Sequence, residues 1–360
     1  MRCHVLLMGM LLAPVVLAQP ADDSALLPAE KMPLADESLL LDVVNTLQRA
    51  VAVGERGHIL LSEDRQQWRQ AESVPTRSTL TAVATFGDDL WAVGHDAVIL
   101  HSADGGLTWD RQFANPNQDP GDDPNPLLDV FFINESRGFA IGAYGRIFIT
   151  QDGGQSWRQE FIGDLIASGD AEDDDYESDE YFEEGEALTP EDMEAALEDV
   201  EDEYYDYHLN GMAQLSDGRL FIAAEAGYGY YSDDQGESWS RIEFPYSGSL
   251  FGVLTTAEDT LLAFGLRGHV FESTDGGETW QEIRTGSQSS IMGGTVTEDG
   301  RIALVGANGE VLVRNSAGSA FQSFSHPDGS DLANVVAGVG ANLLIVGEDG
   351  VSTYAPGAGS

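Results

Sequence analysis

The sequence predicts an all-β fold, a seven-bladed β-propeller of four-stranded blades, and three observations support this prediction. A glycine-containing turn recurs seven times along the chain. A second turn, which ends in tryptophan or phenylalanine, follows it at a nearly constant distance in six of the copies. The repeat unit is about 41 residues long, which is the length of one four-stranded propeller blade.

The glycine-containing turn consists of a small or apolar residue, a glycine, two variable residues and a second glycine. Successive copies are 40, 48, 82, 41, 41 and 41 residues apart. The fourth copy is degenerate, and the 82-residue distance spans two repeat lengths without a further copy. The copies are residues 53–57, 93–97, 141–145, 223–227, 264–268, 305–309 and 346–350.

The second turn follows the pattern Ser/Thr-x-Asp-Gly-Gly-x-Thr/Ser-Trp. We expect its aspartate to accept backbone N–H bonds across the turn and its tryptophan to wedge against the neighbouring sheet. The copy at residues 62–68 is one residue short, and the copy at 314–321 has lost the aspartate. The structural residues predicted in this way are Asp104, Trp109, Asp152, Trp157, Asp234, Trp239, Asp275 and Trp280.

Four short β-rich runs divide one repeat, at residues 128–132, 138–141, 147–149 and 157–161. We name the four strands of each blade A to D, from the innermost to the outermost. The glycine-containing turn then joins strands B and C, where glycine supplies a positive φ. The aspartate-containing turn joins strands C and D.

The two ends of the chain carry further predictions. Blade 7 ends after strand C, at about residues 351–355, so the N-terminal segment 19–36 is expected to close this blade, with residues 26–34 as its missing outer strand. The propeller itself is expected to span residues 37–355. Residues 1–18 have a basic start, an apolar run and small residues at their end, which predicts a cleavable signal peptide. The expected location is the periplasm, with secretion as the alternative.

The charge of the chain is strongly negative, since 62 acidic and 17 basic residues give a net charge of −45. Such a surface repels nucleic acid and anionic lipid headgroups, so neither is expected as a partner. Adaptation to a salty environment is an alternative reason for the acidity.

The aspartate-containing turn resembles the Asp box, or bacterial neuraminidase repeat. Together with the Leu-x-Asp-Val-x-Phe run at residues 127–132, the chain resembles the photosystem II stability and assembly factor-like propellers over about residues 37–355. This resemblance implies a non-catalytic scaffold or assembly factor for a membrane protein complex, without a cofactor. Relatives encoded near resistance-nodulation-division exporters make such an exporter a possible client. Photosynthetic members meet clients through an arginine-rich face, and only Arg56, Arg146 and Arg267 lie in or beside matching turns here.

An acidic insert occupies residues 163–207, between strand D of blade 3 and strand A of blade 4. It holds 21 acidic residues and no lysine or arginine. Because D–A and B–C connections share one face of a propeller, the insert is expected to overhang the face that carries the arginines, as is the proline-rich loop 115–126. An amphipathic helix is predicted at about 190–205, which either packs on the propeller or docks a client. Its expected partner-binding residues are Met193, Leu197, Val200, Tyr204, Tyr205 and the following Tyr207.

Other functions are weighed against this interpretation. A glycan-binding or glycan-hydrolysing Asp-box propeller is the main alternative, with Tyr144, Tyr228 and Tyr230 as candidate aromatic residues; Tyr144 is also a predicted partner-binding residue. A solute sensor that closes its acidic lid over the arginines is a third possibility. We predict no catalytic residues, because the aromatic-Arg-Ile-Pro motif of sialidases is missing. Arg56, Arg146 and Arg267 remain candidates for an anion site at the funnel. The scattered histidines predict no metal site.

Overall fold

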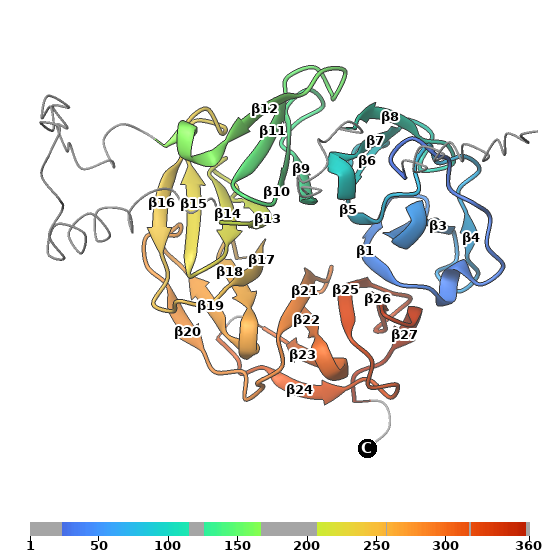
Figure 1. The fold of residues 1–360 in the computed structure, drawn as a ribbon. Coiled ribbons are helices and arrows are strands. Elements are labelled where there is room, and N and C mark those ends of the chain that lie inside the picture. Colours follow the sequence, from blue (N-terminus) through green and yellow to red (C-terminus); the bar gives the residue numbers. More distant parts are fainter. Residues whose placement is uncertain (1–23, 115–125, 167–206, 257, 317, 358–360) are drawn as a thin grey trace, which may run out of the picture.

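The computed structural model describes residues 24–114, 126–166, 207–256, 258–316 and 318–357. Within these residues, seven antiparallel sheets follow one another around a central axis (Figure 1). Six sheets have four strands and the seventh has three, and each sheet is built from strands that are consecutive in the sequence. The predicted seven-bladed all-β propeller is therefore confirmed.

The strands of each blade run outward from A to D. Blades 1 to 4 comprise β1 (Leu40–Asn45), β2 (Ala50–Gly54), β3 (Ile59–Ser62), β4 (Arg69–Gln70); β5 (Leu80–Phe86), β6 (Asp89–Gly94), β7 (Ile99–Ser102), β8 (Asp110–Phe113); β9 (Leu127–Phe132), β10 (Gly138–Gly142), β11 (Arg146–Thr150), β12 (Arg158–Phe161); and β13 (Leu209–Gln214), β14 (Leu220–Ala224), β15 (Tyr228–Ser232), β16 (Ser240–Glu243). Blades 5 to 7 comprise β17 (Leu250–Thr255), β18 (Leu261–Gly265), β19 (Val270–Ser273), β20 (Gln281–Ile283); β21 (Ile291–Val296), β22 (Ile302–Gly306), β23 (Glu310–Arg314), β24 (Gln322–Ser325); and β25 (Leu332–Ala337), β26 (Leu343–Gly347), β27 (Gly350–Tyr354).

The helical elements are single 3-10 turns. They are η1 (Ala35–Glu37), η2 (Glu55–Gly57), η3 (His95–Ala97), η4 (Ile162–Leu165), η5 (Leu266–Gly268) and η6 (Ala307–Gly309). In the part of the chain that the structure describes, no helix has the length and apolar character needed to cross a membrane.

The hydrophobic core lies between the blades. Every residue of strand B is buried in six of the seven blades, as in β2, whereas outer strands such as β8 begin with exposed polar residues. Each apolar cluster is shared by two neighbouring sheets; one joins Val51 of blade 1 to Leu100 of blade 2. A single blade therefore cannot bury its own apolar surface, and the ring of blades folds as one unit.

The glycine-containing turns join strands B and C as predicted, but their two glycines are required for different reasons. The second glycine has a positive φ, as at Gly57 with +69°. The first is extended, with φ −176° at Gly94, where a Cβ atom would overlap the carbonyl oxygen of Thr79. The prediction that positive φ explains these turns was thus wrong for the first glycine, which is needed because the preceding D–A connection passes so close.

The aspartate-containing turns join strands C and D and are held by their own side chains. Asp104 Oδ1 accepts the backbone N–H of Thr108 at 3.0 Å and the hydroxyl of Ser102 at 2.8 Å. In blade 5, hydrogen bonds from Thr279 lower the pKa of Asp275 to about 2. The predicted role of these aspartates as turn acceptors is confirmed.

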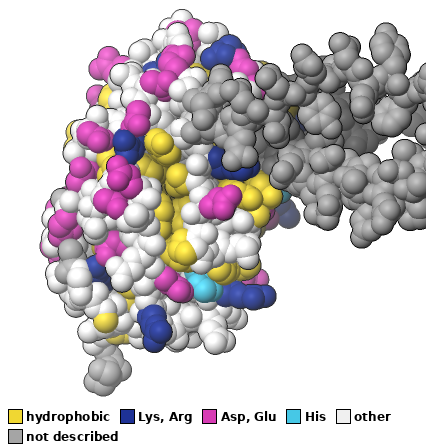
Figure 2. All heavy atoms as spheres, turned by 90° about the vertical axis from the view of Figure 1, so that its left-hand side faces the viewer, with side chains coloured by type: hydrophobic (Ala, Val, Ile, Leu, Met, Phe, Trp, Pro, Cys, Tyr) yellow, Lys and Arg dark blue, Asp and Glu magenta, His cyan; other side chains and the backbone are white. Residues whose placement is uncertain are grey.

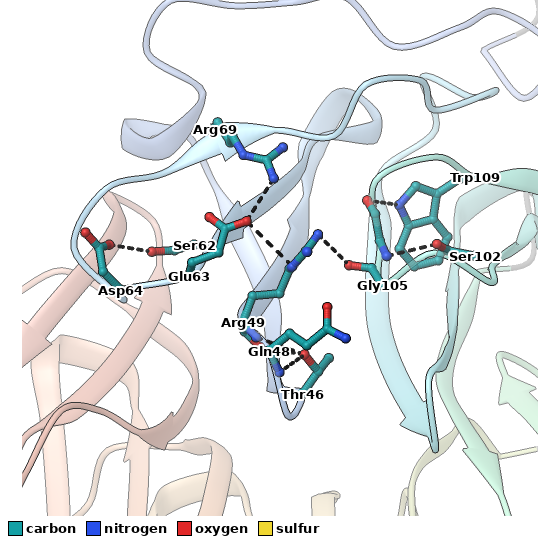
Figure 3. A network of polar contacts seen from close by, with 11 residues as sticks. Thr46, Gln48, Arg49, Ser62, Glu63, Asp64, Arg69, Ser102, Gly105 and Trp109 are labelled. Carbon is teal, nitrogen blue, oxygen red and sulfur yellow. Dashed lines mark hydrogen bonds and ion pairs between the residues drawn. The ribbon is translucent and has the colours of Figure 1, made fainter.

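The tryptophan that ends each turn packs as predicted in several blades. Trp239 of blade 4 is 1 % exposed and lies edge-on to Phe139 of blade 3, with ring centroids 6.3 Å apart. Figure 3 shows the equivalent turn of blade 2, in which Trp109 Nε1 donates to Gly106 O and Gly105 O accepts a hydrogen bond from Arg49 of blade 1. The turn thus fastens each blade to the preceding one.

We expect Asp275→Ala to lower the free energy of unfolding by about 2 kcal/mol, because the buried hydroxyl of Ser273 loses its acceptor, whereas the exposed Thr279 can bind water instead. Chemical denaturation of both proteins measures this loss. Glu278→Ala in the same exposed turn is the matched control, and an equal loss there would contradict the assigned role of Asp275.

The ring closes differently from the sequence prediction. No residue of 26–34 forms a strand, and β27 has β26 as its one neighbour among the described residues. The segment instead lies against blade 1, where the Ala29 amide donates to Val74 O at 2.9 Å. The prediction of a fourth strand from this segment was therefore wrong: the segment reaches blade 7 only through η1, and Ala35 is buried with Val346.

Hydrogen bonds join neighbouring A strands at several junctions, including the junction between blades 7 and 1. Asp42 of blade 1 accepts from the Asn334 side chain of blade 7 and, at 2.7 Å, from the Val83 amide of blade 2. Asp129 of blade 3 likewise accepts from the Met212 amide of blade 4 at 2.7 Å. The first and last blades are thus joined by a buried side-chain bond and by apolar packing.

Candidate protein-binding face

One face of the propeller carries the loops, and we call it the loop face. In every blade, the third residue of the B–C turn donates its amide to the carbonyl that precedes strand A. The D–A and B–C connections therefore lie together, as expected from the sequence. The amide donors are Glu55, His95, Ala143, Glu225, Leu266, Ala307 and Glu348.

The central channel opens on the loop face, and its opening is lined by seven side chains whose direction is changed by β-bulges in the A strands. Strand A has a register shift at its second residue in all seven blades, which leaves that residue out of the ladder. Such β-bulges turn a side chain away from its regular direction. The seven residues line one opening of about 210 Å³: Leu41, Thr81, Leu128, Asn210, Phe251, Met292 and Ala333.

This channel opening has an apolar rim and two acidic side chains. Both polar rim residues are engaged, since Thr81 donates to Leu127 O and Asn210 to Leu250 O. Burial raises the pKa of Asp42 to about 6 and that of Asp129 to about 7, where the charge of Asp42 adds to the effect. The carboxylates bind backbone amides of neighbouring blades, which is a structural use of both groups.

The acidic insert is anchored on the B–C turn of blade 3. Gly145 donates its amide to Tyr207 O at 3.0 Å and accepts the Ile162 amide at 2.8 Å. The start and the end of the insert therefore meet the same turn on the loop face, which confirms the predicted position of the insertion. Residues 167–206, with the predicted helix and Met193, Leu197, Val200, Tyr204 and Tyr205, lie outside the described part of the chain.

Aromatic and basic side chains follow the loop face over blades 3 to 5, and we call them the aromatic–basic arc. Its members are Tyr144, Tyr207, His208, Tyr228, Arg241, Tyr246 and His269. Tyr207 and Tyr228 stack with ring centroids 4.8 Å apart, and Arg241 lies 5.1 Å from the centre of the Tyr228 ring. Tyr246 stacks on His269 at 4.0 Å.

The arc is exposed in part and is flanked by further arginines. Tyr144 is 41 % exposed and lies beside His208, with ring centroids 5.0 Å apart. Arg146 lies over Phe161 and Arg267 is at the exposed tip of the B–C turn of blade 5. Figure 2, which views the left-hand side of Figure 1, shows hydrophobic side chains gathered in a band with acidic side chains beside them. The arc thus brings aromatic rings together with Arg241 and with two histidines, each of which is paired with a glutamate.

The predicted site residues are only partly brought together. Tyr144, Arg146 and Tyr207 meet at the B–C turn of blade 3, whereas Arg56 and Arg267 lie at turn tips in blades 1 and 5. The channel opening contains none of these arginines in its lining, so they do not converge there as an anion site.

Sequence reasoning did not identify His208, Arg241, Tyr246 and His269 as members of the arc. His208 and Tyr246 lie in D–A connections, Arg241 lies in strand D, and His269 lies at the end of a B–C turn, so no single sequence motif joins them. It also did not identify the channel rim, whose members share a position in strand A but not a residue type.

The glycan-binding interpretation loses one of its aromatic candidates. Tyr230 is 4 % exposed and belongs to the core between blades 3 and 4. Of the other two, Tyr228 is half-buried against Tyr207 and Arg241, and Tyr144 alone is well exposed. The three tyrosines therefore do not form the exposed cluster that was expected at the funnel.

The opposite face has a larger opening of about 700 Å³, with charged side chains of both signs in its lining. It is bordered by A–B turns of blades 1, 2, 6 and 7. Its polar groups mostly bind one another: Arg65 donates to Asn45, and Arg301 is paired with Asp299. Over the described residues, no three His, Cys, Asp or Glu side chains are grouped as metal ligands.

The geometry of the C–D turns agrees with a known repeat. The model of the BNR/Asp-box repeat matches residues 230–241 and 271–282, in blades 4 and 5. The chain carries Asp-box repeats. The match includes Asp234 and Trp239 in the first Asp box and Asp275 and Trp280 in the second, which are the side chains that hold these turns.

Solved structures resemble this Asp-box propeller over nearly its whole length. YCF48 bound to D1 peptide has a TM-score of 0.62 at 17 % identity, covering 91 % of this chain and 95 % of that chain. YCF48 from Cyanidioschyzon merolae has a TM-score of 0.60 at 15 % identity, covering 91 % and 98 %. Virginiamycin B lyase from Staphylococcus aureus has 0.64 at 11 % identity, covering 91 % and 97 %. At these identities the similarity shows the fold, and no curated protein matches the sequence.

Proposed function

We propose that this Asp-box propeller is a non-catalytic scaffold or assembly factor, which holds a segment of a membrane protein complex on its loop face. The aromatic–basic arc is the observation that carries the proposal. Aromatic and arginine side chains dominate protein–protein hot spots, and here they cluster in a chain of net charge −45. The propeller supplies a rigid support, while the contacts lie on its connections.

Two further observations support a binding role without chemistry. The titratable side chains in the lining of the channel opening are Asp42 and Asp129, and both bind backbone amides between blades. A propeller of similar fold, YCF48, is known in a complex with D1 peptide, which is a precedent for peptide binding on such a scaffold. The finer proposal is a periplasmic protein with a resistance-nodulation-division exporter as its client, which rests on the signal-like residues 1–18 and the family resemblance.

Crosslinking and affinity capture from native membranes tests the proposal. The double variant Tyr144→Ser, Arg267→Ser removes exposed loop-face side chains from blades 3 and 5 without touching the core. We expect it to reduce recovery of the crosslinked client by roughly tenfold, the effect of one or two hot-spot residues. Mass spectrometry of the captured protein decides whether an exporter is the client.

The matched control is Leu47→Ser, at the tip of the A–B turn of blade 1 on the opposite face. Leu47 is 96 % exposed, so its replacement should leave both stability and client recovery unchanged. If Leu47→Ser abolishes capture and the loop-face variant does not, the client binds the opposite face and the proposed site is wrong.

A further inference from the structure

Blade 7 has an open outer edge. Strand β27 pairs with β26 from Gly350 to Tyr354, and the structure places no described strand on its other side. In the six other blades, the equivalent strand C pairs with a strand on both sides. Thr353 is exposed and its neighbours in β27 are half-buried, so the backbone groups of this edge are accessible. An accessible strand edge is a template for a strand from another chain.

The described residues of the N-terminal segment, 24–36, do not cover this edge. Its residues are bound to blade 1: the Met32 amide donates to Gln70 Oε1 at 2.7 Å, and Lys31 donates to Ala71 O. Only η1 touches the beginning of β27, where the Asp36 carbonyl lies against Gly350. The edge beyond Gly350 is left for another strand.

The other blades show what a fourth strand requires. In blades 2, 4, 5 and 6, strand D places an apolar residue opposite the same position of strand C: Phe113 opposite Ile99, Ile242 opposite Gly229, Ile283 opposite Val270, and Phe324 opposite Val311. The equivalent position of blade 7 is Ser352. In blades 4 to 6 this apolar residue follows an aromatic residue at a distance of three, as Ile283 follows Trp280.

The surroundings of the edge are acidic. A hollow of about 70 Å³ lies at the loop-face end of β27, between the D–A connection before blade 7 and the B–C turn of blade 7. Its lining includes His326, four carboxylate side chains and no lysine or arginine. The four are Asp328, Asp331, Glu348 and Asp349. A strand with basic side chains would gain from this charge, whereas an acidic strand would be repelled.

We propose that the open edge of β27 accepts an extended basic segment of another protein as the fourth strand of blade 7. The segment would carry an aromatic residue and an aliphatic residue three positions apart, with the aliphatic side chain opposite Ser352. This inference goes beyond the proposed function, because it concerns the outer edge of blade 7 rather than the loop face.

A synthetic peptide, Lys-Trp-Lys-Arg-Ile-Lys, tests the proposal on the full-length protein by fluorescence anisotropy at low salt. Two further forms of it are N-methylated on alternate backbone amides. In a paired strand, alternate amides face the neighbouring strand and solvent, so one methylated form should bind like the parent peptide. The other should bind roughly tenfold more weakly, because about two inter-strand hydrogen bonds are lost.

Charge variants and hydrogen exchange complete the test. The variant Asp328→Asn, Asp349→Asn should weaken binding a few-fold at low salt, whereas Asp88→Asn, Asp110→Asn in blade 2 should not. Peptide binding should slow amide exchange at residues 351–354. If all three peptides bind equally well, binding depends on charge attraction and not on inter-strand hydrogen bonds, and the proposal is overturned. The proposal would also be overturned if, without peptide, the amides of residues 351–354 exchange as slowly as those of β23, which is paired on both sides. The edge would then already be covered by this chain or by a second copy of it.

Discussion

Asp42→Ala is expected to lower the free energy of unfolding by about 3 kcal/mol, since each buried donor that loses its acceptor costs about 1 to 3 kcal/mol. Asp42 accepts from the Asn334 side chain and from the Val83 and Val43 amides. The first two of these bonds join blade 1 to blade 7 and to blade 2. The loss of Asp42 therefore removes polar contacts at the junction where the first and last blades meet.

Denaturant-induced unfolding, followed by tryptophan fluorescence, measures this effect. Asp88→Ala is the control, because Asp88 is exposed in the A–B turn of blade 2 and its replacement should change stability little. If Asp42→Ala unfolds at the same denaturant concentration as wild type, the closure depends on apolar packing and on the bond from the Asn45 side chain to Ala337 O, and the assigned role of Asp42 is wrong.

The stability of the protein is expected to decrease between about pH 4 and pH 7. Burial raises the pKa of Asp129 from 3.8 to about 7, so the folded protein holds a proton that the unfolded chain releases. The stabilisation that this bound proton gives the folded state is complete below about pH 4 and is lost as the pH rises through 7. A shift of about three pKa units corresponds to about 4 kcal/mol, and Asp42, with a pKa of about 6, acts in the same direction.

Unfolding curves at several pH values and at high salt, which screens the general repulsion among surface acids, measure this dependence. Asp129→Asn cannot titrate, so its curve should be flatter than that of wild type across the same range. It should also be less stable at low pH, because the NH2 group of the amide cannot accept a hydrogen bond, whereas each oxygen of the Asp129 carboxyl group accepts one, from Met212 and from Val130. The control is Asp110→Asn, at an exposed position of β8, which should leave the pH dependence of stability unchanged. If the stability of Asp129→Asn falls with pH as steeply as that of wild type, Asp129 does not hold the proton that causes the dependence.

Several parts of the candidate site could not be predicted from the sequence because they depend on distant contacts. Tyr144 and His208 are 64 positions apart and meet only because the insert returns to the B–C turn of blade 3. Met292 and Leu41 come to line one opening through bulges, which the residue types do not signal. Asp129 was recognised only as part of a family-like run, and its bond to blade 4 requires the neighbouring sheet.

The sequence by itself determined the number of blades, the order of their strands and the two recurring turns. These features are local: glycine where the D–A connection passes close, aspartate where a turn needs an acceptor, and apolar strands at a constant spacing. Only the tertiary structure decided how the ring closes and where residues 26–34 lie. That segment can bind either blade 7 or blade 1, and its place depends on contacts such as Ala29 with Val74 that no local pattern encodes.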